Sequence, residues 1–226
     1  VVQRQAERIQ TEVADVAGLI VQRTGVDPAL AEQSARHAQR HIGMAQRLAT
    51  DADARARREA TVRAVLDLRS VSDAVDAAGK IIAIATEDAK ALSADRDVSE
   101  REQMRRSMGL VEGAPVPPAF RSQLSALEDD QKRRATRSLR DGIDRVLTDL
   151  QSVFRDMLMV QYGRTETLIN TELQIEIAAV GEGWGPERAL IALDAIAATR
   201  RSLQHNAAPL LAVESMLVTV ASGRKP

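Results

Sequence analysis

The sequence predicts an all-α fold, because three of its features favour helices over strands. Aromatic residues make up only 2% of the 226 residues, although 44% are hydrophobic. The core must therefore consist mainly of Ala, Leu, Ile and Val, and Ala and Leu are among the strongest helix formers. From Phe120 to Val160 the residues at every third or fourth position, which would share one helix face, are nearly always apolar. This spacing is typical of an amphipathic helix. No segment alternates polar and apolar residues as a half-buried strand does.

The first third of the chain predicts short helices joined by tight turns. Their ranges are 12–23, 28–39, 44–49 and a last one from Asp51 or Asp53 to 66. Gly25 ends the first of these helices. Asp27 and Pro28 begin the second, since Asp is a preferred N-cap and Pro is favoured at the first helical position.

From Ser70 onward the chain predicts longer helices joined by loops. Ser70 or Ser72 caps a helix that becomes strongly charged after Ala91, which is typical of a solvated helix. The following segments are a loop at 109–118, helices at 120–162 and 165–180, a turn at 181–185, a helix from 186 to about 203, and a last one at 209–221. The boundary at residues 69 and 70 divides the chain into predicted domains 1–68 and 69–226.

Composition excludes several classes of protein. The formal net charge is −1 and no apolar run approaches the roughly 20 residues that cross a bilayer, so we expect neither a membrane span nor a globally basic nucleic-acid binder. Without cysteine the chain has no disulfides and no thiolate metal ligands, and we expect a reducing compartment. The first residues lack both a Met and the apolar stretch of a signal peptide, so we expect the sequence to be cut from a longer chain.

The sequence offers no combination of residues that predicts catalysis. It has no phosphate-binding GxxxxGK[ST] motif, and Gly181-x-Gly-x-Gly lies between predicted helices and is interpreted as a turn. His37 and His41 are four residues apart, but no third ligand and no neighbouring Glu accompany them. We therefore interpret them as surface histidines near a helix C-terminus and expect no bound metal, no cofactor and no enzymatic activity.

A basic run within the long predicted helix is the clearest candidate contact for an anionic partner. Its members are Lys132, Arg133, Arg134, Arg137 and Arg140. These residues could contact DNA or an acidic protein, or simply form a solvated helix face. Acidic neighbours dilute the local charge, and no aromatic side chain is interleaved for base stacking.

Four segments, in order, resemble the delta-prime subunits of bacterial DNA polymerase III clamp loaders, in their high-GC Gram-positive form. They are residues 40–49 (RHIGMAQRLA), residues 69–80 (RSVSDAVDAAGK), residues 132–144 (KRRATRSLRDGID), and the ending that includes Asp194, Arg200, Pro209 and Met216. The first segment is shared with related ATPases, and the resemblance covers essentially the whole chain.

The resemblance implies an architecture and a role. Residues 1–68 would be the small helical lid of an AAA+ module, and residues 69–226 the collar that joins clamp-loader subunits in a ring. The nucleotide-binding core would lie before Val1. The chain would be a non-catalytic stator in DNA replication, in the cytoplasm at the replisome. Its partners would be the tau/gamma and delta subunits, and indirectly the sliding clamp and primer-template DNA. The ring contact would use Leu203, Asn206, Leu210, Leu211 and Glu214.

One position distinguishes this hypothesis from its nearest alternative. Clamp-loader ATPases of the tau/gamma type carry a sensor arginine in a Gly-x-x-Arg pattern on the lid, and counting from Gly43 places Gln46 there, with Arg47 one residue later. A tau/gamma-type ATPase subunit remains one alternative. A helical bundle that binds acidic partners or nucleic acid through its basic run remains another. If the collar hypothesis holds, residues 70–226 alone should fold and self-associate.

Overall fold

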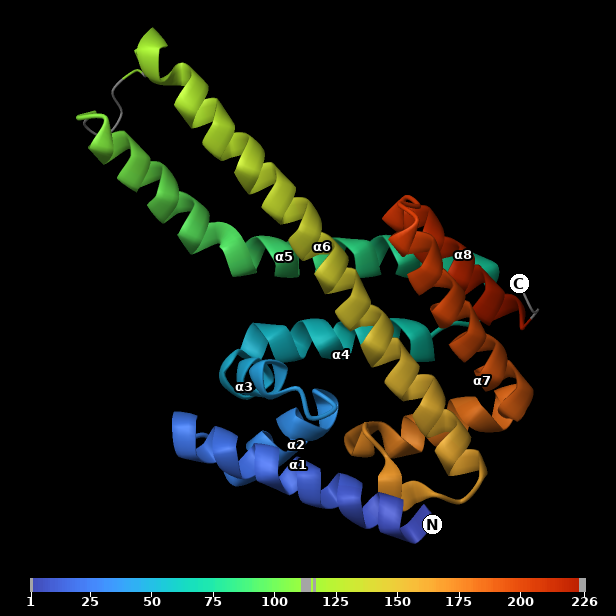
Figure 1. Ribbon diagram of the computed structural model, residues 1–226. Coiled ribbons are helices and arrows are strands. Elements are labelled where there is room, and N and C mark those ends of the chain that lie inside the picture. The colour runs from blue at the N-terminus through green and yellow to red at the C-terminus, as the bar shows by residue number, and fades with distance from the viewer. Residues whose placement is uncertain (1, 111–114, 116, 224–226) are drawn as a thin grey trace.

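Helices account for nearly all of the structure. The computed structural model describes residues 2–110, 115 and 117–223, and these residues form helices and loops without a strand, so the predicted all-α fold is confirmed (Figure 1). The helices are α1 (Val2–Thr24), α2 (Pro28–His37), α3 (Ile42–Thr50), α4 (Ala52–Leu66), α5 (Val71–Ser107), α6 (Pro118–Gln161), α7 (Gln174–Gln204) and α8 (Pro209–Ser222). Two 3-10 turns, η1 (Thr165–Thr167) and η2 (Thr171–Leu173), precede α7. None of the described helices is both long and apolar enough to cross a membrane.

Several helices begin at the residues whose side chains predict a cap. The Asp27 carboxylate accepts a hydrogen bond from the backbone N–H of Ala29 at 2.8 Å, and Pro28 occupies the first helical position of α2. Ser70, rather than Ser72, caps α5. Its hydroxyl accepts from the Asp73 backbone N–H while the Asp73 carboxylate accepts from the Ser70 N–H, which is a reciprocal capping box.

The chain between α6 and α8 differs from the predicted pattern at two places. Residues 165–173 form η1, η2 and the link between them instead of the predicted α-helix, because the backbone N–H groups of Ile169 and Asn170 donate to the buried Asp156 carboxylate instead of to helix carbonyls. The predicted turn at 181–185 is instead a kink inside α7. Gly185 has φ +70° and Pro186 follows it, a combination that redirects the helix axis because glycine tolerates positive φ and proline lacks the N–H.

The buried apolar side chains form two separate cores that meet on α4. The smaller core contains side chains of α1, α2 and α3, together with Ala54 at the start of α4. The larger core contains Val62, Val65 and Leu66 from the end of α4, with side chains of α5, α6, α7 and α8. We call α1–α3 the small unit and α5–α8 the large unit; α4 supplies side chains to both.

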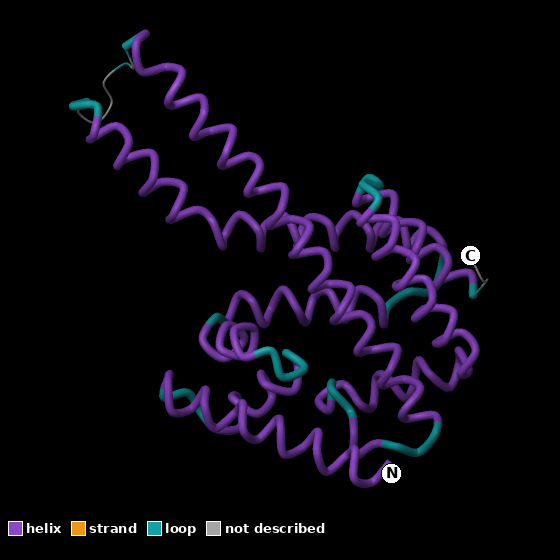
Figure 2. The backbone as a smooth tube through the Cα atoms, in the orientation of Figure 1, coloured by secondary structure: helices purple, strands orange, loops and turns teal. Residues whose placement is uncertain are grey.

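A helical hairpin extends out of the large unit. Figures 1 and 2 show the last part of α5 and the first part of α6 leaving the body side by side. We call α5 from Asp97 onward and α6 up to Arg134 the arm. Polar contacts hold its base, where Gln131 is buried and its amide donates to the Asp97 carbonyl at 3.0 Å. Arg134 binds the carboxylates of Asp97, Asp130 and Glu100.

Candidate functional site

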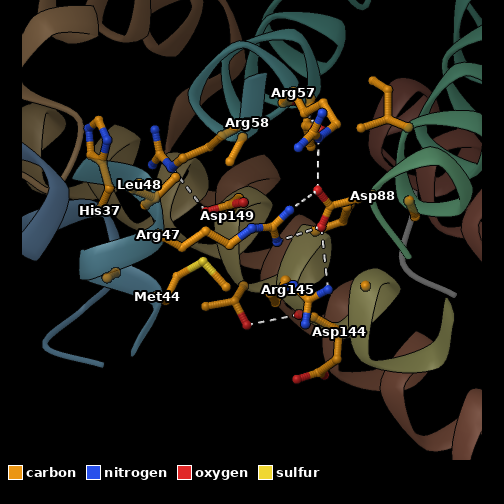
Figure 3. A pocket seen from close by; sticks show the side chains of 18 of the residues that line it. His37, Met44, Arg47, Leu48, Arg57, Arg58, Asp88, Asp144, Arg145 and Asp149 are labelled. Carbon is orange, nitrogen blue, oxygen red and sulfur yellow. Dashed lines mark hydrogen bonds and ion pairs between the residues drawn. The ribbon is translucent and has the colours of Figure 1, made fainter. Parts of the chain in front are cut away.

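The joint between the small and large units is built around one carboxylate. Asp88 on α5 accepts hydrogen bonds from Arg47 of α3 and Arg57 of α4, each at 2.8 Å, and lies 3.4 Å from Arg145 of α6 (Figure 3). Partial burial works against ionisation of Asp88, but the arginines outweigh it, and the pKa of Asp88 lies below its usual value. Four helices are thus tied together at a single side chain.

A second polar contact crosses the joint one turn further along α6. Arg58 of α4 is buried and donates to Asp149 of α6 at 3.1 Å and to the side-chain oxygen of Asn170. Asn170 is fully buried, and its amide nitrogen donates to Ser152 and Asp156. Burial raises the pKa of Asp149 to about 6, although the Arg58 charge opposes the shift.

A histidine completes this line of contacts. His37 at the end of α2 faces Glu172 of η2, with Nε2 and Oε1 2.8 Å apart. Burial lowers the pKa of His37. Burial acts against the charge of Glu172 as well, but the His37 hydrogen bond and the nearby Arg58 charge prevail and lower its pKa to about 2. The predicted surface position is therefore wrong for His37. His41 is exposed and caps α3.

Two pockets lie beside the joint. One, of about 400 Å³, has an apolar wall that includes Met44, Leu48 and Ile84 and is bordered by the arginines around Asp88. The other, of about 420 Å³, lies between α1 and α2 and the segment 166–171. The described residues contain no group of three or more His, Asp or Glu arranged to hold a metal ion. The joint thus brings charged side chains of four helices together at the edge of a pocket.

Gln46, the position that the resemblance assigns to a sensor arginine, faces away from this joint. Gln46 is exposed on α3, whereas Arg47 turns to the large unit and binds Asp88. Shifting the Gly-x-x-Arg count by one residue would therefore select an arginine that is already engaged by a carboxylate of its own chain.

The predicted ring-contact residues gather where α7 turns into α8. Leu210 and Leu211 in the first turn of α8 are 45% and 65% exposed. Asn206 adopts a left-handed conformation, with φ 64°, and accepts a hydrogen bond from Arg140 at 2.7 Å. Leu203 packs partly against the larger core, and Glu214 is half-buried.

Most of the basic run is engaged by neighbouring side chains. Arg134 is bound by three carboxylates at the base of the arm, and Arg140 donates to Asn206. Lys132 and Arg133 lie 3.5 Å and 3.8 Å from Asp129 and Asp130, although both cations are well exposed. Arg137 is exposed as well, so Lys132, Arg133 and Arg137 keep their charge accessible at the surface, whereas Arg134 and Arg140 are bound within the chain.

The joint residues were not identified from the sequence, although a signal was present. On α5 the positions 74, 78, 81, 85 and 88 form one stripe, and all but Asp88 are small or apolar residues. On α4 Arg58 interrupts a similar stripe. A charged residue on the apolar face of a helix indicates a buried partner, but the partner itself cannot be named from spacing.

Comparison with protein-family models, with curated proteins and with solved structures found no match in any of the three.

Proposed function

We propose that this chain is a non-catalytic, structural subunit of a clamp loader of the delta-prime type, which joins its ring through the large unit. The observation that carries the proposal is the meeting of two segments of the resemblance, 132–144 and the ending after Asp194. Arg140 binds Asn206, and Arg200 donates to Asp144 at 2.9 Å. These contacts hold the turn after which Leu210 and Leu211 are presented to solvent.

The exposed leucines support a subunit contact. Large apolar side chains that lie exposed next to each other are candidates for the anchors that protein interfaces bury, and Leu210 and Leu211 are 45% and 65% exposed. α8 already uses Val213, Met216 and Leu217 to pack on the larger core, so Leu210 and Leu211 contribute little to the fold of the chain.

The lid position supports a non-hydrolysing subunit over a tau/gamma-type ATPase. Gln46 carries no charge for a nucleotide phosphate, and the adjacent Arg47 is paired with Asp88. No cofactor or metal takes part in this proposal. A stator needs a fixed angle between its units. The ion pairs of the joint would hold the small unit at a fixed angle to the large unit.

The proposal is tested by assembly with purified tau/gamma and delta subunits, followed by sedimentation velocity. We expect the chain to enter a complex, and the double variant Leu210→Asp, Leu211→Asp to weaken assembly at least about tenfold, because interface anchors each contribute more than about 1 kcal/mol. Ile175→Asp, at an apolar position that is 83% exposed at the start of α7, is the matched control and should assemble normally. A folded chain that joins neither subunit would contradict the proposal.

A further inference from the structure

The outer end of the arm carries a charge pattern that the proposed function does not use. Residues 101–127 contain four arginines, no lysine and two glutamates, Glu102 and Glu112, and Glu112 lies outside the described residues. The arginines, which we call the tip cluster, are Arg101, Arg105, Arg106 and Arg121. Arg101 directly follows Glu100 at the base of the arm, and the other three lie further out.

The arm holds the tip cluster away from the rest of the molecule. By helical rise, the distance along α6 from Gln131 to Pro118 is roughly 20 Å, and both figures show this part standing clear of α7 and α8. The contacts of Gln131 and Arg134 with Asp97 join α5 to α6 at the base. A hairpin joined in this way can present its end to a partner at a fixed place.

The tip cluster is accessible. Arg101, Arg106 and Arg121 are exposed, and Arg105 is half-buried. Arg101 donates to the Asp97 carbonyl, which orients its guanidinium without neutralising it. The ion pair of Arg106 with Glu102 is long, at 3.9 Å, and both side chains are more than 60% exposed, so it competes weakly with an outside anion.

The chemistry of the tip favours phosphates over a protein surface. Among the described residues from 101 to 127, no large apolar side chain is strongly exposed, and a protein contact normally needs such an anchor. Binding to a nucleic-acid backbone needs only cations, and arginine binds phosphate oxygens through two parallel hydrogen bonds. We infer that the tip cluster is a docking site for the phosphate backbone of a nucleic acid.

The test measures binding of the full chain to a fluorescein-labelled 20-base-pair DNA duplex by fluorescence anisotropy, between 50 and 200 mM KCl. The tip variant carries Arg101→Gln, Arg106→Gln and Arg121→Gln. The matched control carries Lys132→Gln, Arg133→Gln and Arg137→Gln, which removes the same charge from the basic run. Circular dichroism establishes that both variants are folded.

We expect the tip variant to bind at least about tenfold more weakly at 50 mM KCl, with the slope of log K against log salt reduced by about 2 to 3, because about 0.9 counterion is released per phosphate contact. The control should bind within about twofold of the unchanged chain. Equal losses in both variants, or no binding by the unchanged chain, would overturn the inference. Equally tight, tip-dependent binding of poly-glutamate would overturn it too, because it would assign the site to acidic proteins.

Discussion

At the level of single residues, the joint depends on a few charged side chains in places where apolar ones are usual. Asp88 binds three arginines from three other helices, and Arg58 reaches both Asp149 and Asn170. Each charge is stabilised by its partners and penalised by burial, and the balance differs between sites. The arginines prevail at Asp88, whereas burial prevails at Asp149.

The raised pKa of Asp149 predicts a pH dependence with a definite sign. Burial raises the pKa of Asp149 in the folded chain to about 6, from the ordinary aspartate value of 3.8 that applies to the unfolded chain. The resulting stabilisation is fully present below about pH 4 and is lost as pH rises through about 6. Asparagine resembles the protonated acid at every pH. Lowering the pH from 7.5 to 4.5 should therefore raise the free energy of unfolding of the unchanged chain relative to Asp149→Asn by about 2 kcal/mol.

Urea unfolding of both proteins at the two pH values measures this difference. Asp129→Asn, at an exposed position on the arm, is the control that measures the effect of removing an exposed carboxylate. A difference that does not change with pH, or that falls as the pH is lowered, would show that burial does not dominate at Asp149.

At the level of helices, caps decide where elements begin and one helix serves two cores. α5 begins at Ser70 because its hydroxyl and the Asp73 carboxylate satisfy each other's backbone N–H groups. α4 packs its first turn into the smaller core and its last turns into the larger one. Together these two features place the small unit against the large one.

The capping box predicts a difference between two neighbouring serines. Ser70→Ala should lower the free energy of unfolding by about 1 kcal/mol, because the Asp73 N–H loses its acceptor. Ser72→Ala lies two residues later on an exposed face of the same helix and should change it by less than about 0.5 kcal/mol. Thermal or urea unfolding measures both, and equal losses in the two variants would argue against the cap.

At the level of the whole molecule, one shared helix and a line of polar contacts join the two units, and two pockets lie beside this joint. The arm extends from the large unit, and the exposed leucines of α8 lie beside the turn that Arg140 holds. The exposed leucines of α8 and the end of the arm therefore lie on separate parts of the molecule (Figure 1).

Because α4 belongs to both cores, cutting the chain at the predicted boundary should destabilise the large unit. A fragment of residues 69–226 loses Val62, Val65 and Leu66 from the larger core, and each fully buried side chain of this kind contributes about 1.5–3 kcal/mol. A fragment of residues 52–226 keeps them. We expect the longer fragment to unfold at a distinctly higher temperature in calorimetry. Equal unfolding temperatures would show that the end of α4 is dispensable.

Local chemistry was sufficient to predict the helical class, the cap at Asp27, a cap at Ser70 or Ser72, and a long helix over 120–162, which is α6 (Pro118–Gln161) in the structure. Helix propensity, apolar spacing and capping depend on residues within a few positions of one another. The same reasoning failed at residues 165–173, where the distant Asp156 carboxylate binds the backbone.

Only the tertiary structure decided which charged residues meet. Asp88 was visible in the sequence as a charge on an apolar stripe, but its arginines come from positions 47, 57 and 145. The same holds for His37 with Glu172, and for Arg140 with Asn206. Periodicity shows which face of a helix is buried, whereas the partner of a buried charge depends on how helices far apart in the chain pack, which no local pattern records.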